Sequence, residues 1–338
     1  MVAATGWTRA SAGGADMALL EVEHLTVALA TAQGRVALVR DVGFALPAGG
    51  TLGIVGESGS GKSLTALAMM GLLPLGAQVT GKVRFEGQDL TQMPEPQLCA
   101  LRGAAMAMVF QEPMTALNPL HRIGDQIAEP LRLHRRLGRV AAHAQVVALM
   151  QRVGLQDPQR RAKSYPHELS GGQRQRAMIA MALACGPKLL IADEPTTALD
   201  ATTQAQILDL IAGLVEDMQM ALLLISHDLA VIAQNVTHVL VMYAGQIVES
   251  GMVAAVLAHP AHPYTRALLA ARPGLSGARL ATIAGMAPKP GDVPPGCSFA
   301  PRCGFAIAAC AMSPPALVDL GDGHLVRCIR PEAWIAVP

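Results

Sequence analysis

The stretch that decides the fold is an apolar run followed by a glycine-rich octapeptide, Thr51-Leu52-Gly53-Ile54-Val55 and then Gly56-Glu57-Ser58-Gly59-Ser60-Gly61-Lys62-Ser63. An apolar strand that leads through this glycine spacing into a helix is the pattern of a phosphate-binding P-loop. Glycines let backbone N–H groups converge on a triphosphate, and the N-terminus of the following helix adds a favourable dipole. We therefore predict that Lys62 reaches the β and γ phosphates of a nucleoside triphosphate and that Ser63 holds Mg²⁺.

Composition excludes several classes of function. The formal net charge is +1, so the chain builds no broad positive field and we expect no nucleic-acid partner. Although 51% of the residues are apolar, no run reaches the roughly eighteen uninterrupted apolar residues that a membrane span needs. The N-terminus also lacks a compact apolar segment followed by a cleavage site. We therefore expect a protein of the cytosol.

Alternation of apolar patterns predicts an α/β architecture. Segments 20–29 and 36–46 alternate as an antiparallel pair of strands, and further strands are expected at 83–85, 104–110, 188–192, 220–226 and 237–243. Helices are expected at 62–72 and 201–218, with a mostly helical insert over 123–153. Strands that are apolar on both faces imply a mostly parallel sheet covered on both sides.

The two ends of the chain differ from this middle part. Residues 1–16 are small, polar and without periodicity, so we expect a disordered leader or a start codon assigned too early. Beyond residue 260 the composition shifts to Pro, Gly and Cys, which predicts a loop-rich C-terminal extension over 261–338.

Polar side chains follow two of the apolar strands. Asp193 and Glu194 come directly after the strand at 188–192, where α/β sheets present their ligand sites. Asp193 suits Mg²⁺, and Glu194 is placed to orient or deprotonate the water that attacks the γ-phosphate. His227 follows the strand at 220–226 in the same way and is expected to contact the γ-phosphate. The plainer alternatives are a solvated acidic turn and a structural histidine.

A further motif identifies a family. Leu169-Ser170-Gly171-Gly172-Gln173 precedes a long predicted helix, which Ser170 is expected to cap. Together with the P-loop, Gln111, the Asp193-Glu194 pair, Ala198-Leu199-Asp200 and His227, in this order and spacing, the pentapeptide resembles the ABC transporter ATPases over roughly residues 19 to 330. The resemblance implies a P-loop NTPase domain over 17–260 with a RecA-like parallel core, an antiparallel β subdomain and a helical subdomain at about 112–175.

The resemblance also implies roles for residues outside the P-loop. The turn at Ser170, Gly171, Gly172 and Gln173 would cap the γ-phosphate of ATP held by another subunit, which implies a dimer with Asp200 on its seam. Gln111 would sense Mg²⁺ or the attacking water and couple the site to the helical insert, which touches membrane subunits. Family members usually stack adenine on an aromatic residue, but this chain has Leu29 at the matching position. We therefore expect Leu29 or Val36 to contact the base, with weaker affinity.

Several segments resemble one branch of that family, the oligopeptide and dipeptide importers. They are Phe110 to Pro119, Met242 to Glu249, His262 to Leu269 and Gly296 to Cys303. This branch implies a second ATPase subunit, with a paralogue favoured over a copy, two transmembrane permease subunits and an extracytoplasmic solute-binding protein. It implies a peripheral protein on the cytoplasmic face of the cell (inner) membrane. Nickel or another small solute remains an alternative cargo, and a soluble ABC regulator or a redox-sensing, metal-binding switch is a different class of function.

Four cysteines gather in the last part of the chain, with the spacing C-x(5)-C-x(6)-C-x(17)-C at Cys297, Cys303, Cys310 and Cys328. Four thiolates suit either a zinc ion or an iron–sulfur cluster. The comparable tails of the branch suggest a 4Fe-4S cluster, with Zn²⁺ as the alternative. A bound group would stabilise an extension that buries little by itself.

Overall fold

The computed structural model describes residues 18–31, 34–197, 199–271 and 283–331, which fall into two compact units. We call them the P-loop unit (described residues of 1–47, 51–92 and 226–338) and the helical unit (48–50 and 93–225). The predicted leader at 1–16 lies outside the described residues.

The P-loop unit contains an antiparallel sheet in the order β2-β1-β4-β5. Its strands are β1 (Leu20–Thr31), β2 (Gly34–Leu46), β4 (Gln78–Phe85) and β5 (Gln88–Asp89). Alternation along β1 buries Leu20, Val22, Leu25 and Val27, which confirms the predicted antiparallel pair. Strand β4 begins five residues before the expected segment 83–85. The sequence pattern missed these five residues because they are exposed and carry no apolar alternation.

A second group of strands in this unit has the order β11-β12-β10-β9-β3. Strands β3 (Thr51–Val55) and β9 (His238–Tyr243) are parallel, and β10 (Gln246–Met252) is antiparallel to β9. The sequence prediction missed β10. Ala244 and Gly245 form a two-residue hairpin with φ values of 47° and 83°, a geometry that joins antiparallel strands. The mixed sheet is therefore less parallel than expected.

Helices of the P-loop unit are short. They are α1 (Lys62–Met69), α9 (Leu229–Asn235), α10 (Val253–Ala258) and α11 (Pro263–Ala270), with a 3-10 turn at Leu90–Gln92. Helix α1 ends three residues before the predicted boundary at residue 72.

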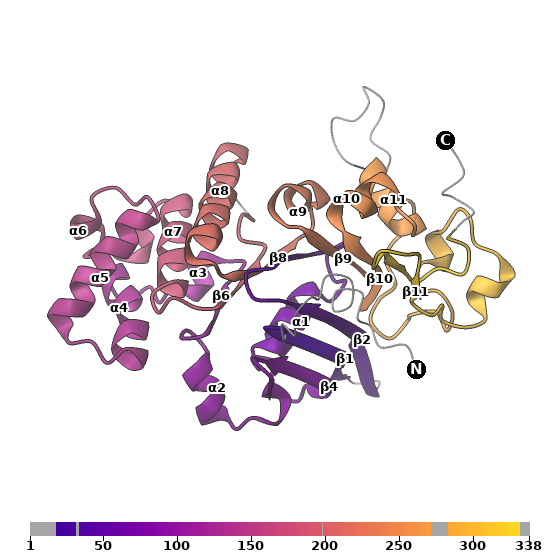
Figure 1. Ribbon diagram of the computed structural model, residues 1–338, viewed down its shortest axis with the longest axis horizontal. Coiled ribbons are helices and arrows are strands. Elements are labelled where there is room, and N and C mark those ends of the chain that lie inside the picture. The colour runs from indigo at the N-terminus through magenta and orange to yellow at the C-terminus, as the bar shows by residue number, and fades with distance from the viewer. Residues whose placement is uncertain (1–17, 32–33, 198, 272–282, 332–338) are drawn as a thin grey trace. The chain divides into compact units, whose positions relative to one another are not determined.

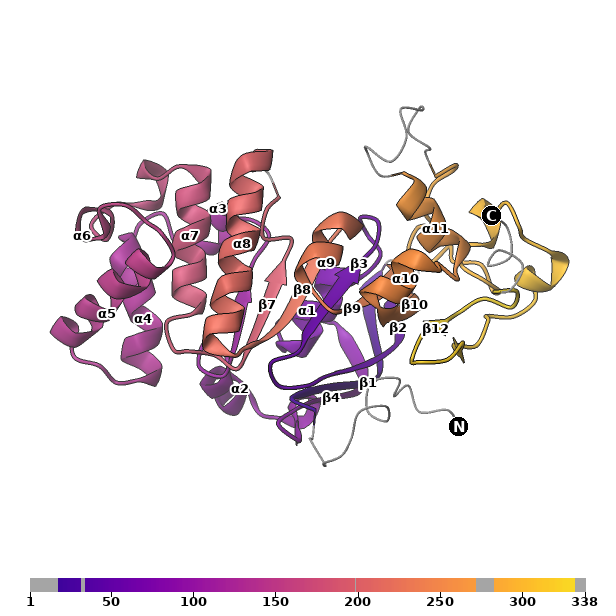
Figure 2. The same ribbon diagram turned by 45° about the horizontal axis from the view of Figure 1, so that its top comes forward.

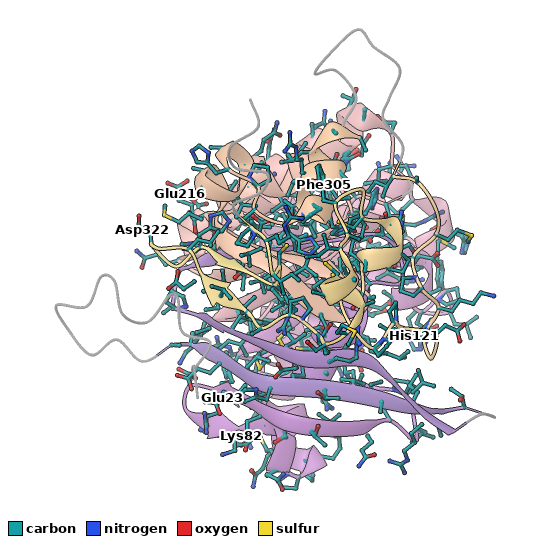
Figure 3. All side chains as sticks on the ribbon, turned by 90° about the vertical axis from the view of Figure 1, so that its right-hand side faces the viewer. Glu23, Lys82, His121, Glu216, Phe305 and Asp322 are labelled. Atoms are coloured by element: carbon teal, nitrogen blue, oxygen red, sulfur yellow. The ribbon has the colours of Figure 1, made fainter. Side chains whose placement is uncertain are left out.

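The C-terminal extension also belongs to the P-loop unit. After residue 282 it contains 3-10 turns at Ala300–Arg302 and Ala308–Ala311 and the two-residue strands β11 (Val318–Asp319) and β12 (Leu325–Val326). Strand β12 pairs with β10, which attaches the extension to the sheet. Figure 3 looks onto this extension, with Phe305 and Asp322 on it and with Glu23 and Lys82 opposite each other on β1 and β4.

The helical unit contains three parallel strands in the order β8-β7-β6. They are β6 (Met106–Val109), β7 (Leu189–Asp193) and β8 (Ala221–Ser226), and every residue of β7 is buried. Its helices are α2 (Glu95–Leu101), α3 (Pro113–Ala116), α4 (Ile123–His134), α5 (Arg139–Arg152), α6 (Pro158–Arg161), α7 (Gly171–Ala182) and α8 (Ala201–Met218). Helices α4, α5 and α7 pack against one another, as Figures 1 and 2 show.

The predicted apolar face of the helical insert is present. Ile127 and Leu131 of α4 and Val146 of α5 are buried. Helix α7 also packs against α8 within this unit. Across the described ranges, no helix is both long and apolar enough to cross a bilayer.

Candidate nucleotide-binding site

The P-loop joins β3 to α1, as the sequence predicts. Gly61 is the N-cap of α1, with φ at 101°, and as a glycine it offers no side chain to cap the helix N-terminus. A Cβ at Gly56 would lie 2.2 Å from the carbonyl oxygen of Met242, so only glycine fits there. The loop therefore brings a helix N-terminus and close-packed backbone together, which is the arrangement that binds phosphate.

Lys62 lies inside this loop. Its ammonium donates to the carbonyl oxygens of Gly56 at 2.7 Å and Glu57 at 3.1 Å, and the residue is 4% exposed. The hydroxyl of Ser60 is buried and has no hydrogen-bond partner within the described chain. A buried cation and an unpartnered hydroxyl in one glycine-rich loop fit a triphosphate, because its oxygens accept from both. Ser58, Gly59 and Ser63 complete the loop, with φ at 76° for Gly59.

Leu29 is placed on β1 directly opposite Val36 of β2, and both side chains are partly exposed. A Cβ at Gly291 in the extension would lie 3.6 Å from Val36, so backbone of the extension runs beside this apolar pair. The role of Leu29 toward adenine stays a prediction.

His227 is exposed at the start of α9. The helix is capped by its neighbour Asp228, whose carboxylate accepts from the amide of Ala230 at 2.7 Å.

In the helical unit, the ends of β6 and β7 bring Gln111 and Glu194 together. Gln111 Nε2 donates to Glu194 Oε2 at 3.3 Å, and the hydroxyl of Thr197 donates to the same oxygen at 3.0 Å. Asp193, the last residue of β7, is 4% exposed. Strands β6 and β7 are neighbouring parallel strands that end at one edge of the sheet, and this pairing brings the two side chains together.

Glu194 has a left-handed backbone with φ at 45°. A non-glycine residue pays for this conformation, and such strain concentrates at functional positions. Sequence reasoning did not foresee either this conformation or the contact with Thr197, because both depend on the turn that follows β7.

Ser170 caps α7, as predicted. Its Oγ accepts from the amide of Gln173 at 3.3 Å, and the side chain of Gln173 accepts from the amide of Ser170 at 3.1 Å. A Cβ at Gly172 would lie 2.8 Å from Thr203 Cγ2, so glycine lets the start of α7 approach α8. Gly171 precedes it in the first turn.

Asp200 caps α8. Its carboxylate accepts from the amide of Thr203 at 3.0 Å and from the hydroxyl of Thr203 at 2.7 Å. These hydrogen bonds, the backbone one foremost, lower the pKa of Asp200. The side chain is therefore ionised at neutral pH.

The sequence prediction missed two residues that touch the P-loop. Arg302 forms an ion pair with Glu57, and the hydroxyl of Tyr264 accepts from the amide of Glu57 at 2.8 Å. Both lie more than 200 residues further along the chain, and no spacing rule connects them to the P-loop.

The four clustered cysteines line one small cavity of about 20 Å³ together with Phe299 and Phe305. Burial raises the pKa of Cys297 and Cys303 and raises that of Cys328 to about 11, and the neighbouring thiols add to the shift of Cys328. Where the chain is described, no group of three or more His, Cys, Asp or Glu is arranged to hold a metal ion. The four thiols share one cavity, but among the described residues they are not arranged as metal ligands.

Family models match two parts of the chain. One described as "ABC transporter" matches residues 39–197, and one described as "Oligopeptide/dipeptide transporter, C-terminal region" matches residues 248–310. The second match includes Cys297, Cys303 and Cys310.

Curated relatives align over nearly the whole chain. The oligopeptide transport ATP-binding protein OppD of Salmonella typhimurium is 48% identical over 315 residues, which are 93% of this chain and 94% of that protein. OppD of Haemophilus influenzae is 47% identical over 312 residues, covering 92% and 96%.

Solved structures share the fold. The dimeric structure of MJ0796, a bacterial ABC transporter cassette, aligns with a TM-score of 0.62 and 25% identity over 69% of this chain and 98% of that one. A post-hydrolysis state of MJ0796 bound to ADP and Pi aligns with a TM-score of 0.62 and 24% identity, over the same shares of both chains.

Proposed function

This chain belongs to the ABC transporter ATPases, and from that premise we propose that it energises the import of di- and oligopeptides across the cytoplasmic membrane. ATP hydrolysis is the activity of the family. Peptide as cargo is supported by the match of residues 248–310 to the oligopeptide/dipeptide transporter region and by the names of the relatives. Nickel or another small solute is the alternative cargo for the same ATPase.

The assigned roles follow the chemistry of each side chain. Lys62 binds the β and γ phosphates, and Ser63 and Asp193 hold Mg²⁺, which neutralises charge on the phosphates when bound. Glu194 accepts a proton from the attacking water or orients it, with Gln111 and Thr197 fixing its carboxylate. His227 contacts the γ-phosphate. The single observation that carries this assignment is the buried Lys62 inside the glycine-rich turn.

The Ser170 turn is assigned to a second ATPase subunit's nucleotide. The capped N-terminus of the twelve-residue helix α7 presents a dipole that favours an anion, and Asp200 lies on the seam between the subunits. A paralogous partner, and so a heterodimer, is favoured. ATP binding then closes the pair and hydrolysis reopens it.

Permease subunits are proposed to dock on the helical unit. A cavity of about 860 Å³ there is lined by residues of α3, α4 and their flanks, among them Asn118, His121, Glu129 and Leu133. Leu120 and Leu133 are large apolar side chains that are 82% and 68% exposed. Exposed apolar groups beside a concave surface are typical of a protein interface. The assembly would place this chain on the cytoplasmic face of the inner membrane, served by an extracytoplasmic solute-binding protein.

Residues 17–260 are assigned to the ATPase domain, with its helical subdomain at about 112–175, and residues 261–338 to the extension. We also propose that Cys297, Cys303, Cys310 and Cys328 hold a 4Fe-4S cluster or Zn²⁺, supported by their convergence on one cavity. Burial raises the pKa of Cys297, Cys303 and Cys328, and binding to a metal would deprotonate them. A group bonded to all four cysteines would then hold the extension together. Anaerobically purified protein that is colourless and contains neither iron nor zinc would rule this out.

Replacement of Glu194 tests the catalytic proposal. In the assembled transporter, Glu194→Gln is expected to bind ATP but to lose at least about 100-fold in hydrolysis and all peptide uptake. The matched control is Glu216→Gln on α8, whose side chain is exposed. Retained hydrolysis in Glu194→Gln would remove Glu194 from the catalytic role, and uptake of another solute in place of peptides would revise the cargo.

A further inference from the structure

The second residue of the P-loop, Glu57, is held by the C-terminal part of the chain. Its amide donates to the hydroxyl of Tyr264 at 2.8 Å. Its carboxylate accepts two hydrogen bonds from the guanidinium of Arg302, at 2.8 Å from Nη1 and 3.1 Å from Nη2. A paired bidentate contact of this kind fixes both the position and the orientation of a carboxylate.

Arg302 is itself fully engaged. Its other hydrogen bonds go from Nε to the carbonyl of Ala284 at 3.0 Å, from Nη1 to the hydroxyl of Tyr243 at 3.3 Å and from Nη2 to the carbonyl of Ile283 at 3.4 Å. The side chain is 6% exposed, and its charge lies 5.8 Å from the ring centroid of Tyr243. Five donors in a planar fork match these five acceptors, and a lysine has neither the number nor the geometry.

Glu57 also connects directly to the phosphate-binding lysine. The carbonyl oxygen of Glu57 accepts from Lys62 at 3.1 Å and from the amide of Ser60 at 3.1 Å. The backbone that Arg302 and Tyr264 hold in place is therefore the backbone that orients Lys62. A movement of Glu57 would shift one of the carbonyl acceptors that orient the Lys62 ammonium.

Charge gives a second reason for this contact. A carboxylate in a loop that receives a triphosphate repels the ligand unless a cation compensates it. Arg302 is the cation paired with Glu57 within the described chain, and it comes from the extension rather than from the P-loop. Arg302 also precedes Cys303, which lines the thiol cavity.

We propose that Arg302 is a positioning residue for the nucleotide site, so that the C-terminal extension sets the affinity of the P-loop for ATP through Glu57. The proposal rests on the ATP site described above. Loss of Arg302 leaves the carboxylate of Glu57 without its fixing contact and without its compensating charge, which weakens ATP binding. Removal of the Glu57 charge in the same chain removes the repulsion and restores part of the affinity.

The experiment measures the Kd of ATP for the full-length chain in its assembled transporter. Arg302→Ala is expected to raise Kd about tenfold, because a half-buried carboxylate loses its partner beside an anionic ligand. Arg302→Lys should lie between Arg302→Ala and the natural chain. The double variant Arg302→Ala with Glu57→Gln should bind ATP at least about threefold more tightly than Arg302→Ala alone.

Three controls separate the explanations. Arg327→Ala removes another partly buried arginine of the extension, which bonds the carbonyls of Ile247 and Pro315 but not the P-loop, and should leave Kd unchanged. Lys62→Ala should abolish ATP binding; if it does not, the proposed nucleotide site fails, whatever Arg302 does. Glu57→Gln removes the fixing contact and the repulsion together, so its Kd should rise less than that of Arg302→Ala; Arg302→Lys takes the place of Arg302→Ala if the alanine variant does not fold.

Several results would overturn the proposal. One is an unchanged Kd in Arg302→Ala. Another is a double variant that binds no better than Arg302→Ala, since a merely structural role is not rescued by removing a charge. A loss of affinity in Glu57→Gln as large as that in Arg302→Ala, or an equal loss in Arg327→Ala, would likewise assign the effect to general disruption of the extension.

Discussion

Truncation of Glu249 on β10 should strongly destabilise the P-loop unit. The carboxylate is fully buried and accepts from the amides of Ala261 at 2.7 Å and His262 at 2.9 Å, with His324 Nε2 at 2.8 Å. These contacts tie the sheet both to the start of α11 and to the extension beside β12. Glu249→Ala leaves two amides and a histidine buried without their acceptor.

The magnitude follows from these contacts. Hydrogen bonds to a charged group contribute about 1.5–3 kcal/mol each, and loss of one partner from a buried pair costs about 3–5 kcal/mol. Because water can enter part of the vacated space, we expect a loss of about 4 kcal/mol in the free energy of unfolding. For a unit of this size that corresponds to a fall of roughly 10 °C in Tm.

Thermal unfolding followed by circular dichroism measures the effect. Glu249→Gln keeps the shape but turns an N–H donor toward a backbone amide, so a loss of about 2 kcal/mol is expected. Glu216→Ala, an exposed carboxylate on α8, is the control and should stay within about 0.5 kcal/mol of the natural chain. A Tm for Glu249→Ala within about 2 °C of the natural protein would refute the reasoning.

Three further substitutions test the helices, the acid stability and the adenine contact. Gly213 lies on the exposed face of α8, and the added methyl of Gly213→Ala would meet nothing within 4 Å. This substitution should raise the free energy of unfolding, measured in urea, by about 0.5–1 kcal/mol, and no increase would mean that the helix is frayed there. Burial lowers the pKa of His262 to about 3, whereas the unfolded value is about 6.5, so the unfolded chain binds more protons below pH 6.5. The contribution of His262 to the free energy of unfolding is therefore fully present above pH 6.5, and about 2 kcal/mol is lost by pH 5. His262→Asn can still cap α11 and should reduce this loss, as measured by denaturant unfolding at pH 7 and at pH 5. Leu29→Tyr should tighten the binding of a fluorescent adenine nucleotide several-fold by stacking, on the order of 1 kcal/mol, and an unchanged affinity would count against Leu29 as the adenine contact.

Local patterns allowed much of the fold and of the candidate site to be predicted. The P-loop between β3 and α1 depends on a strand, glycines and a helix start that are adjacent in the chain. The place of Asp193 and Glu194 at the end of β7 follows from one rule about strand ends, and the cap at Ser170 from one short motif. These features need only neighbouring residues or a single sheet edge, so residue types and spacing suffice.

Other features depend on contacts between segments that are far apart in the chain. The sequence prediction did not find β10, because Glu249 and Ser250 interrupt its apolar pattern, and both are buried between β9 and the extension. The left-handed Glu194 likewise depends on packing around the turn.

The amino-acid sequence by itself determined that a triphosphate-binding loop exists and which strand ends carry its acidic and polar partners, since periodicity and spacing encode both. Only the tertiary structure decided that Arg302 reaches Glu57 across 245 positions of sequence and that the four cysteines converge on one cavity. The physical reason is that ion pairs and burial depend on distances in space, and no local residue pattern shows which of two segments so far apart in the chain will meet.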